Sequence, residues 1–148
     1  ALRICLARKA SPEATRREMK PKLLIVDDDL AITRQLFWML SEEFDVTTAN
    51  DLSTALRRAT IYEPDVAILD LHLPPTLNSP DAGLRILEYV KSHVPSAKVF
   101  VVSSAAGIET QKACFRSGAD GFLSKPLDVE QLLSTVRGAG LERRLAAA

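Results

Sequence analysis

Short runs of apolar residues alternate with longer amphipathic segments along the chain from Lys22 onward. Residues 23–26, 66–69 and 99–102 are apolar at every position and rich in branched side chains. Runs of this length and composition predict strands that are buried on both faces of a parallel sheet. Weaker strand patterns cover residues 44–49 and 121–123, which would bring the sheet to five strands.

The segments between these runs carry apolar residues three or four positions apart, which predicts helices with one buried face. The predicted helices cover residues 30–40, 52–61, 82–92, 108–116 and 129–144. Because strand and helix alternate five times, we expect an α/β fold, a doubly wound five-stranded parallel sheet with right-handed crossovers. The five-strand form of this architecture has the strand order 2-1-3-4-5.

The connection after the third predicted strand, residues 71–83, exceeds the 2–6 residues that are usual between a strand and a helix. It contains Pro74, Pro75 and Pro80. Proline disfavours helix at and before its own position, so we expect this loop to be extended. Long loops of this kind are often functional.

The length of 148 residues, with 47% hydrophobic and 26% charged residues, fits one globular domain. We expect the domain to cover residues 21–140, with an N-terminal extension at 1–20 and a tail or linker start at 141–148. The chain begins with Ala1, and Met19 stands just before the first strand. Residues 1–18 are therefore expected to be non-native or disordered, the alternative being a basic arm with a role of its own.

Charge is unevenly spread although the formal net charge is zero. Residues 1–22 carry seven basic and two acidic side chains, a net of +5, so the rest carries −5. An acidic body gives no reason to expect binding to nucleic acid. The two cysteines, Cys5 and Cys114, favour a reducing compartment, and no apolar run is long enough to span a membrane, so we expect a cytoplasmic protein.

The polar residues at the ends of the predicted strands are the candidates for a functional site. Asp27 and Asp28 follow the first strand, Asp70 the third, Ser103 the fourth and Lys125 the fifth. In an open parallel sheet, ligands bind at the carboxyl ends of the strands, where the strand order reverses. Four separate segments would therefore bring three carboxylates, a hydroxyl and an ammonium group to one edge.

Clustered carboxylates repel one another unless a cation compensates their charge. Oxygen ligands of this kind suit Mg²⁺, which keeps coordination places for water and phosphate oxygens. A carboxylate such as Asp70 can also accept a phosphoryl group. Lys125 and Ser103 would then hold the oxygens of that group.

Each of these residues also has a structural interpretation. The acidic run could cap the helix that follows it, which we accept for Asp29, although a cap needs one carboxylate and not three. Asp70 could be a solvated strand end, Ser103 a turn residue and Lys125 a surface lysine. Their joint placement at four strand ends favours the functional interpretation.

Four motifs in this order resemble the receiver domain of two-component response regulators, over residues 21–138. They are Val26-Asp27-Asp28, Leu69-Asp70-Leu71-His72-Leu73-Pro74, Val102-Ser103-Ser104, and the segment from Gly118 to Lys125-Pro126. The resemblance implies a flavodoxin-like sandwich of five strand–helix units. It also implies that the chain is no enzyme beyond catalysing its own phosphorylation and dephosphorylation.

The resemblance further implies a role for each residue. Asp70 matches the phosphoacceptor, and Asp27, Asp28 and Asp70 match the acids of the Mg²⁺ site. The backbone carbonyl of His72 matches the third protein ligand of the metal. Ser103 and Lys125 match the hydroxyl and ammonium groups that bind the phosphoryl oxygens. Ser103 and Phe122 match the pair of switch residues.

The implied partners are a sensor histidine kinase or a phosphotransfer protein. A homodimer would form through the face of the fourth helix, fifth strand and fifth helix. An output domain outside this chain is expected, and the proline-rich loop resembles receivers of some sigma-54-dependent activators. A stand-alone receiver is the alternative.

Four features depart from the family pattern. Ser103 replaces the commoner Thr, Ser104 replaces a smaller residue, Phe122 replaces the commoner Tyr, and the loop after Asp70 is longer. Two other functions compete with a phosphoacceptor switch. A phosphohydrolase of the haloacid dehalogenase type would need a second Asp where His72 stands, and a degenerate receiver would not retain the acidic cluster with Ser103 and Lys125.

Overall fold

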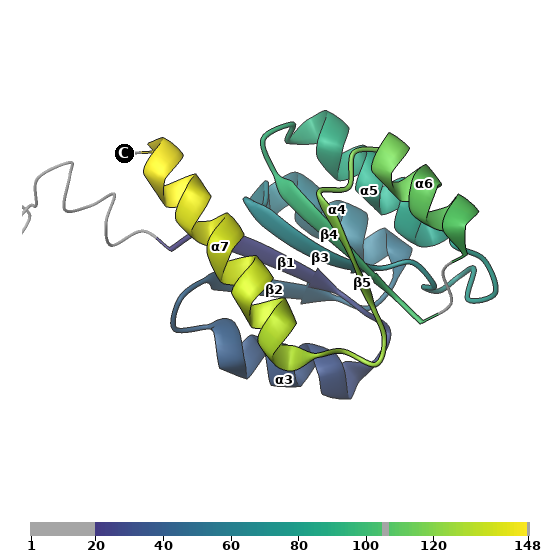
Figure 1. Ribbon diagram of the computed structural model, residues 1–148, viewed down its shortest axis with the longest axis horizontal. Helices are drawn as coiled ribbons and strands as arrows, with labels where there is room; N and C mark the ends of the chain where they lie inside the picture. Colours follow the sequence, from purple (N-terminus) through teal and green to yellow (C-terminus); the bar gives the residue numbers. More distant parts are fainter. Residues whose placement is uncertain (1–19, 105–106, 148) are drawn as a thin grey trace, which may run out of the picture.

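The structure, a computed structural model, describes residues 20–104 and 107–147. Its five strands form one parallel sheet in the order β2-β1-β3-β4-β5 (Figure 1). This confirms the predicted fold class and strand order. The strands are β1 (Lys22–Val26), β2 (Asp45–Ala49), β3 (Val66–Asp70), β4 (Lys98–Ser103) and β5 (Gly121–Ser124).

Helices cover both faces of the sheet in a three-layer sandwich. One face carries α3 and α7, and the other carries α4, α5 and α6 (Figure 1). This arrangement follows from right-handed crossovers that reverse direction at β1. The helices are α3 (Leu30–Leu40), α4 (Leu52–Tyr62), α5 (Asp81–His93), α6 (Ile108–Arg116) and α7 (Val129–Ala147).

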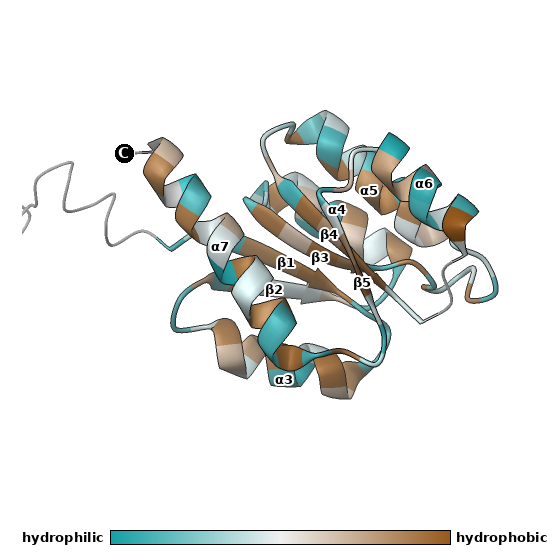
Figure 2. Ribbon diagram, viewed as in Figure 1, coloured by the Kyte–Doolittle hydropathy of each residue, from teal (hydrophilic) through white to brown (hydrophobic). Residues whose placement is uncertain are grey.

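The core has two apolar layers, one on each side of the sheet, and the central strands β1, β3 and β4 are mostly apolar (Figure 2). Alternate residues of each strand point to opposite layers, so Leu24 and Val26 face α4 and α5, while Leu23 and Ile25 face α3 and α7. Burial on both faces is what the continuous apolar runs predicted.

The register brings the carboxyl ends of the central strands level. Val26 pairs with Ala49 of β2 and with Leu69 of β3. Asp70 pairs with Val102, one residue before the end of β4. The residues that follow these strands therefore lie along one edge of the sheet.

The segment between β3 and α5 differs from the extended loop that we predicted. It covers only residues 71–80, because α5 already begins at Asp81. It forms two successive turns, in which Thr76 N–H donates to Leu73 O (2.9 Å) and Ser79 N–H donates to Thr76 O (3.1 Å). Proline fixes a φ angle that suits turns, so the prolines here favour turns over an extended path.

The loop is attached to the body of the domain. Leu71 and Leu73 are fully buried, and Leu52 N–H at the start of α4 donates to Pro74 O (3.1 Å). Gly83 brings α5 against the end of β3, because a Cβ there would lie 2.4 Å from the Leu71 Cα atom. The backbone after Asp70 is thus held by both α4 and α5.

Two sequence predictions concern the ends of the chain. The proposed extension, residues 1–20, lies outside the described residues except for Lys20. The last helix continues to Ala147, three residues beyond its predicted end. Within the described ranges, none of the helices combines the length and apolar character that a membrane span requires.

Candidate functional site

Asp27 is a buried acid at the carboxyl end of β1, with 5% of its surface exposed. Its backbone N–H donates to Ala49 O (3.1 Å), which continues the pairing of β1 with β2. Its carboxylate Oδ1 accepts the backbone N–H of Asp29 (2.9 Å). The chain therefore turns sharply after β1 around the Asp27 side chain.

Asp29 ends this turn and begins α3. Its carboxylate accepts the backbone N–H groups of Ala31 and Ile32, so it is the N-cap of the helix. This is the structural role that the sequence predicted for one of the three acids. Asp27 and Asp28 are not needed as the N-cap of α3.

Asp70 is the last residue of β3 and is equally buried, with 5% exposure. Its Oδ1 accepts the backbone N–H of His72 (3.1 Å). Its Oδ2 accepts a hydrogen bond from Lys125 Nζ (2.9 Å). The carboxylate is therefore oriented by one backbone and one charged donor.

Lys125 lies directly after β5 and joins the acids of two strands. Its Nζ contacts Asp27 Oδ2 at 3.1 Å and Asp70 Oδ2 at 2.9 Å. Its backbone N–H donates to Ser103 O (3.0 Å), which ties the start of this loop to the end of β4. The lysine is thus held at both its backbone and its ammonium group.

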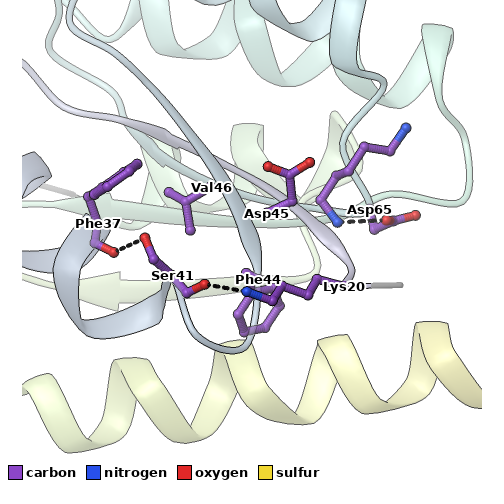
Figure 3. Close-up of a pocket in the computed structure, with 8 residues that line it drawn as sticks. Lys20, Phe37, Ser41, Phe44, Asp45, Val46 and Asp65 are labelled. Atoms are coloured by element: carbon purple, nitrogen blue, oxygen red, sulfur yellow. Dashed lines mark hydrogen bonds between the residues drawn. The ribbon is translucent and has the colours of Figure 1, made fainter. Parts of the chain in front are cut away.

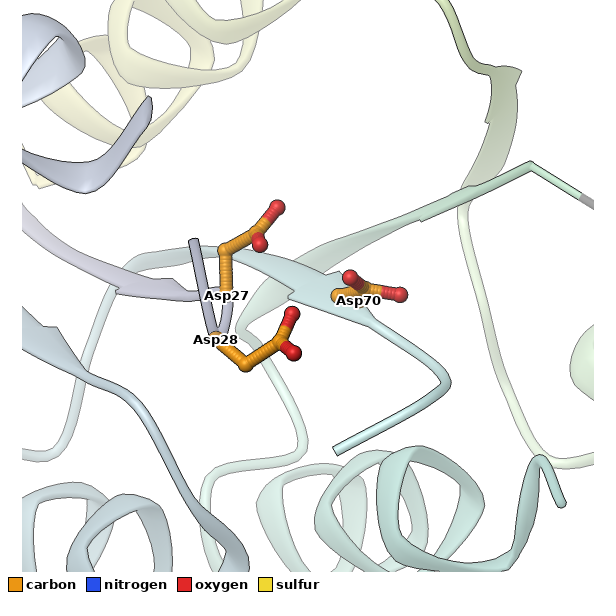
Figure 4. A group of neighbouring side chains, drawn as sticks. All are labelled: Asp27, Asp28 and Asp70. Carbon is orange, nitrogen blue, oxygen red and sulfur yellow. The ribbon is translucent and has the colours of Figure 1, made fainter. Parts of the chain in front are cut away.

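Asp28 completes an acidic group with Asp27 and Asp70, and the three side chains lie close together at the ends of β1 and β3 (Figure 4). One carboxylate oxygen from each lies within 4.8 Å of the others. Asp28 is exposed, whereas the other two are buried. The group therefore opens to solvent on the Asp28 side.

The charges of this group do not balance. Burial raises the pKa of the Asp27 carboxyl above its ordinary value of 3.8. Burial also lowers the pKa of Lys125, but its bonds to Asp70 and Asp27 outweigh this effect and raise it. The Lys125 ammonium group pairs with two of the three carboxylates, so the acidic group carries an excess of negative charge.

This donor set fits Mg²⁺. The group offers carboxylate oxygens, it has an excess of negative charge, and it opens to solvent, where a hydrated ion can enter. The residues present are therefore able to hold the metal that the sequence predicted.

The remaining predicted site residues lie around this group. Ser103 is buried at the last position of β4, and His72 is half-buried two residues after Asp70. Phe122 in β5 is half-buried and packs against the core layer that α4, α5 and α6 cover. The structure places all of them at or near the same edge, and their roles stay predictions.

Sequence reasoning did not single out two residues that support the site. Asn50 follows β2, and its Nδ2 donates to Asp27 O (2.7 Å). Gly83 allows α5 to approach the backbone after Asp70. A polar residue after a weak strand was the available signal for Asn50, and a small residue near a helix start was the signal for Gly83.

A hollow of about 600 Å³ lies at the opposite edge of the sheet (Figure 3). Its lining residues lie near the amino ends of β1, β2 and β3 or near the end of α3: Lys20, Lys22, Phe37, Ser41, Phe44, Asp45, Val46 and Asp65. None of the predicted site residues lies in it. The acidic group, and not this hollow, is the candidate site.

Comparison with known sequences gives consistent matches. A family model described as response regulator receiver domain matches residues 23–137. The transcriptional regulatory protein KdpE of Staphylococcus aureus is 32% identical over 120 residues, 80% of this chain and 49% of KdpE. The transcriptional regulatory protein PrrA of Mycobacterium leprae is 33% identical over 129 residues, 86% of this chain and 53% of PrrA. The chain spans about half the length of these curated relatives.

Solved structures share the fold. A response regulator receiver domain protein (CheY-like) from Methanospirillum hungatei has a TM-score of 0.77 and 26% identity, covering 88% of this chain and 100% of that one. The receiver domain of NtrX from Brucella abortus has a TM-score of 0.68 and 29% identity, covering 80% of this chain and 97% of that one.

Proposed function

This chain belongs to the receiver domains of response regulators, and from that premise we propose that Asp70 accepts a phosphoryl group from a histidine kinase or phosphotransfer protein. Mg²⁺ would be held by Asp27, Asp28, Asp70 and the backbone carbonyl of His72. The observation that carries the proposal is that a lysine and two further acids meet at Asp70. Its carboxylate contacts Lys125 and lies within 4.8 Å of two other acids.

In the transfer, a carboxylate oxygen of Asp70 attacks the phosphorus of the donor. The new O–P bond forms as the bond from phosphorus to the donor histidine nitrogen breaks, and the electron pair leaves with that nitrogen. Bound Mg²⁺ supplies positive charge that stabilises the phosphoryl oxygens. In hydrolysis, water attacks the same phosphorus, the O–P bond to Asp70 breaks, and inorganic phosphate leaves as the Asp70 carboxylate is restored.

Lys125 and Ser103 act on the phosphoryl group after it arrives. Lys125 Nζ already contacts Asp70 Oδ2 at 2.9 Å, so its ammonium group is in place to pair with a phosphoryl oxygen. Ser103 lies in the next strand, and its hydroxyl would donate to another oxygen. Both residues would orient the phosphoryl group that Asp70 receives.

The same event would switch the face formed by α6, β5 and α7. Movement of the Ser103 hydroxyl toward Asp70 leaves space for the half-buried Phe122 side chain to turn inward, which shifts the population between two packings. Within this face, α6 exposes the apolar side chains of Ile108 and Phe115. These apolar side chains support a homodimer through this face as the signalling state.

The output lies outside this chain. Two relatives are named transcriptional regulatory proteins, and the chain spans about half of each. We infer that the receiver controls an attached output domain in a cytoplasmic regulator of transcription. A link to sigma-54-dependent activators stays a prediction.

Phosphorylation is tested by incubating the protein with Mg²⁺ and a small-molecule phosphodonor and measuring its intact mass. The wild type should gain the mass of one phosphoryl group, and Asp70→Asn should gain none. Asp65→Asn, an acid at the opposite edge of the sheet, is the matched control and should be modified like the wild type. A gain that survives Asp70→Asn, or no gain in the wild type, would contradict the proposal.

A further inference from the structure

Asn50 is attached to the acidic turn from the side of β2. It follows the last residue of β2, and its side-chain Nδ2 donates to the backbone carbonyl of Asp27 at 2.7 Å in a partly buried position. The Asp27 N–H donates to Ala49 O at 3.1 Å. Both backbone groups of Asp27 are therefore bonded to the end of β2.

The Asp27 carbonyl belongs to the peptide group that joins Asp27 to Asp28. Because a peptide group is planar, a hydrogen bond to its oxygen fixes the plane from which the Asp28 residue continues. On the other side of the turn, the Asp29 N–H is bonded to Asp27 Oδ1 at 2.9 Å. The backbone of Asp28 is thus held between two fixed points.

Asp28 depends on this backbone support more than its neighbours do. The Asp27 and Asp70 carboxylates are oriented by Lys125, but no hydrogen bond or ion pair of the Asp28 carboxylate occurs within the described ranges. The side chain is exposed, yet it lies with the other two acids (Figure 4). Its place in the group therefore comes from the turn that carries it.

We propose that Asn50 is a positioning residue, whose amide fixes the Asp27–Asp28 peptide and thereby aims the Asp28 carboxylate at the metal. This rests on the proposed function, which makes the acidic group a Mg²⁺ site. The role requires a donor, and the Asn50 amide supplies one at 2.7 Å from the Asp27 carbonyl oxygen. The carboxylate of the neighbouring Asp51 has no proton to donate, and it caps α4 by accepting Thr54 N–H (2.8 Å).

The first experiment measures Mg²⁺ affinity by calorimetry for the wild type, Asn50→Ala and Asn78→Ala. Asn78 is exposed in the loop after β3 and is the matched control. Loss of a residue that orients a metal ligand should weaken binding about tenfold, equivalent to about 1.4 kcal/mol. Asn78→Ala should bind like the wild type. Equal affinity in folded Asn50→Ala would overturn the proposal.

A second measurement, without metal, separates positioning from a loss of folding. In the wild type, the side-chain amide protons of Asn50 should exchange with solvent more slowly than those of Asn78, because one is bonded to Asp27 O. Equally fast exchange of the two amides would overturn the proposal even if Asn50→Ala does not fold. In that variant, if folded, the Asp29 backbone amide should lose protection.

The two experiments also separate this inference from the proposed function. If the wild type does not bind Mg²⁺, the metal site itself is wrong. If the wild type binds Mg²⁺ and Asn50→Ala binds it equally, the acidic group is the metal site and only the role of Asn50 is wrong.

Discussion

The two edges of the sheet both bring acidic and basic side chains together, but in different proportions. At the amino edge, Asp65 precedes β3, accepts the Lys22 N–H (2.8 Å) and pairs with Arg143 (3.3 Å). Asp120 precedes β5 in the same way, accepting the Val99 N–H (2.8 Å) and pairing with Lys91 (3.2 Å). Each of these carboxylates has one backbone donor and one cation of its own.

At the carboxyl edge, Lys125 is shared between Asp27 and Asp70, and Asp28 adds a third carboxylate. Unbalanced charge at a partly buried position costs stability unless a ligand compensates it. The acid–base pairs of the amino edge therefore have a structural role, because they connect strands to helices. The carboxyl edge has more carboxylates than cations, an imbalance that a bound metal ion would compensate.

The largest expected effect comes from removing the shared lysine. Lys125→Met leaves two buried carboxylates without their ammonium group, so we expect the free energy of unfolding without Mg²⁺ to fall by about 2 kcal/mol. Added Mg²⁺ should raise the free energy of unfolding of the variant by more than it raises that of the wild type, and so recover part of this loss. Urea denaturation with and without Mg²⁺ measures both quantities.

The matched substitution at the amino edge is Lys91→Met. Asp120 keeps its backbone donor there, so the loss should stay below about 1 kcal/mol, and Mg²⁺ should not recover it. Equal losses in the two lysine variants, or recovery by Mg²⁺ in both, would remove the distinction between the edges.

The effect expected from Asp65→Ala at the amino edge lies between those of the two lysine variants. The substitution leaves the Lys22 N–H and the Arg143 guanidinium without their shared acceptor, so unfolding should become easier by about 1.5 kcal/mol. Mg²⁺ affinity should not change, because Asp65 lies at the opposite edge from the acidic group. Denaturation and calorimetry on the same sample test both statements, and weakened Mg²⁺ binding would contradict the comparison.

The pH should act on the carboxyl edge through Asp27. Since burial raises its pKa above 3.8 in the folded protein, the folded state binds this proton more tightly than the unfolded chain does. Without Mg²⁺, the contribution of Asp27 to stability therefore falls as the pH rises from 3.8 through its folded pKa. Over the same interval Mg²⁺ affinity should rise with pH, because protons stop competing with the metal.

The difference between the unfolding free energies of the wild type and Asp27→Asn, measured against pH, isolates this contribution. A difference that does not vary with pH would show that Asp27 titrates alike in the folded and unfolded states.

The smallest effect is expected from Asp28→Asn. Removing one of three neighbouring like charges near the surface should raise the unfolding free energy without Mg²⁺ by about 0.5 kcal/mol. The same substitution should reduce the stabilisation that Mg²⁺ provides, since a ligand is lost. If the variant is less stable than the wild type without Mg²⁺, the Asp28 carboxylate makes a stabilising contact like those of the acids at the amino edge.

Much of the fold could be predicted because its signals are local. The apolar runs of β1, β3 and β4 and the periodicity of the helices depend only on neighbouring residues. The meeting of Asp27, Asp70 and Lys125 then follows from strand order, since parallel strands end at a common edge. The family match supports this order from independent evidence.

The features that escaped prediction depend on contacts between distant segments. The bond from Asn50 to Asp27 requires the register of β2 against β1, and β2 is an edge strand with a weak sequence pattern. The attachment of residues 71–80 to the domain includes the bond from Leu52 N–H at the start of α4 to Pro74 O. The paired acids of the amino edge, such as Asp65, read as ordinary loop residues until Arg143 of the last helix is placed.

The bond between Lys125 and Asp27 joins residues 98 positions apart. Such a contact closes almost the whole domain into one loop, and distant contacts form slowly because much chain entropy must be lost first. A chain that has not finished folding, or has not yet emerged through β5, therefore has the acids without their lysine. The full set of groups to which the proposed function assigns the phosphoryl group is therefore assembled only late in folding.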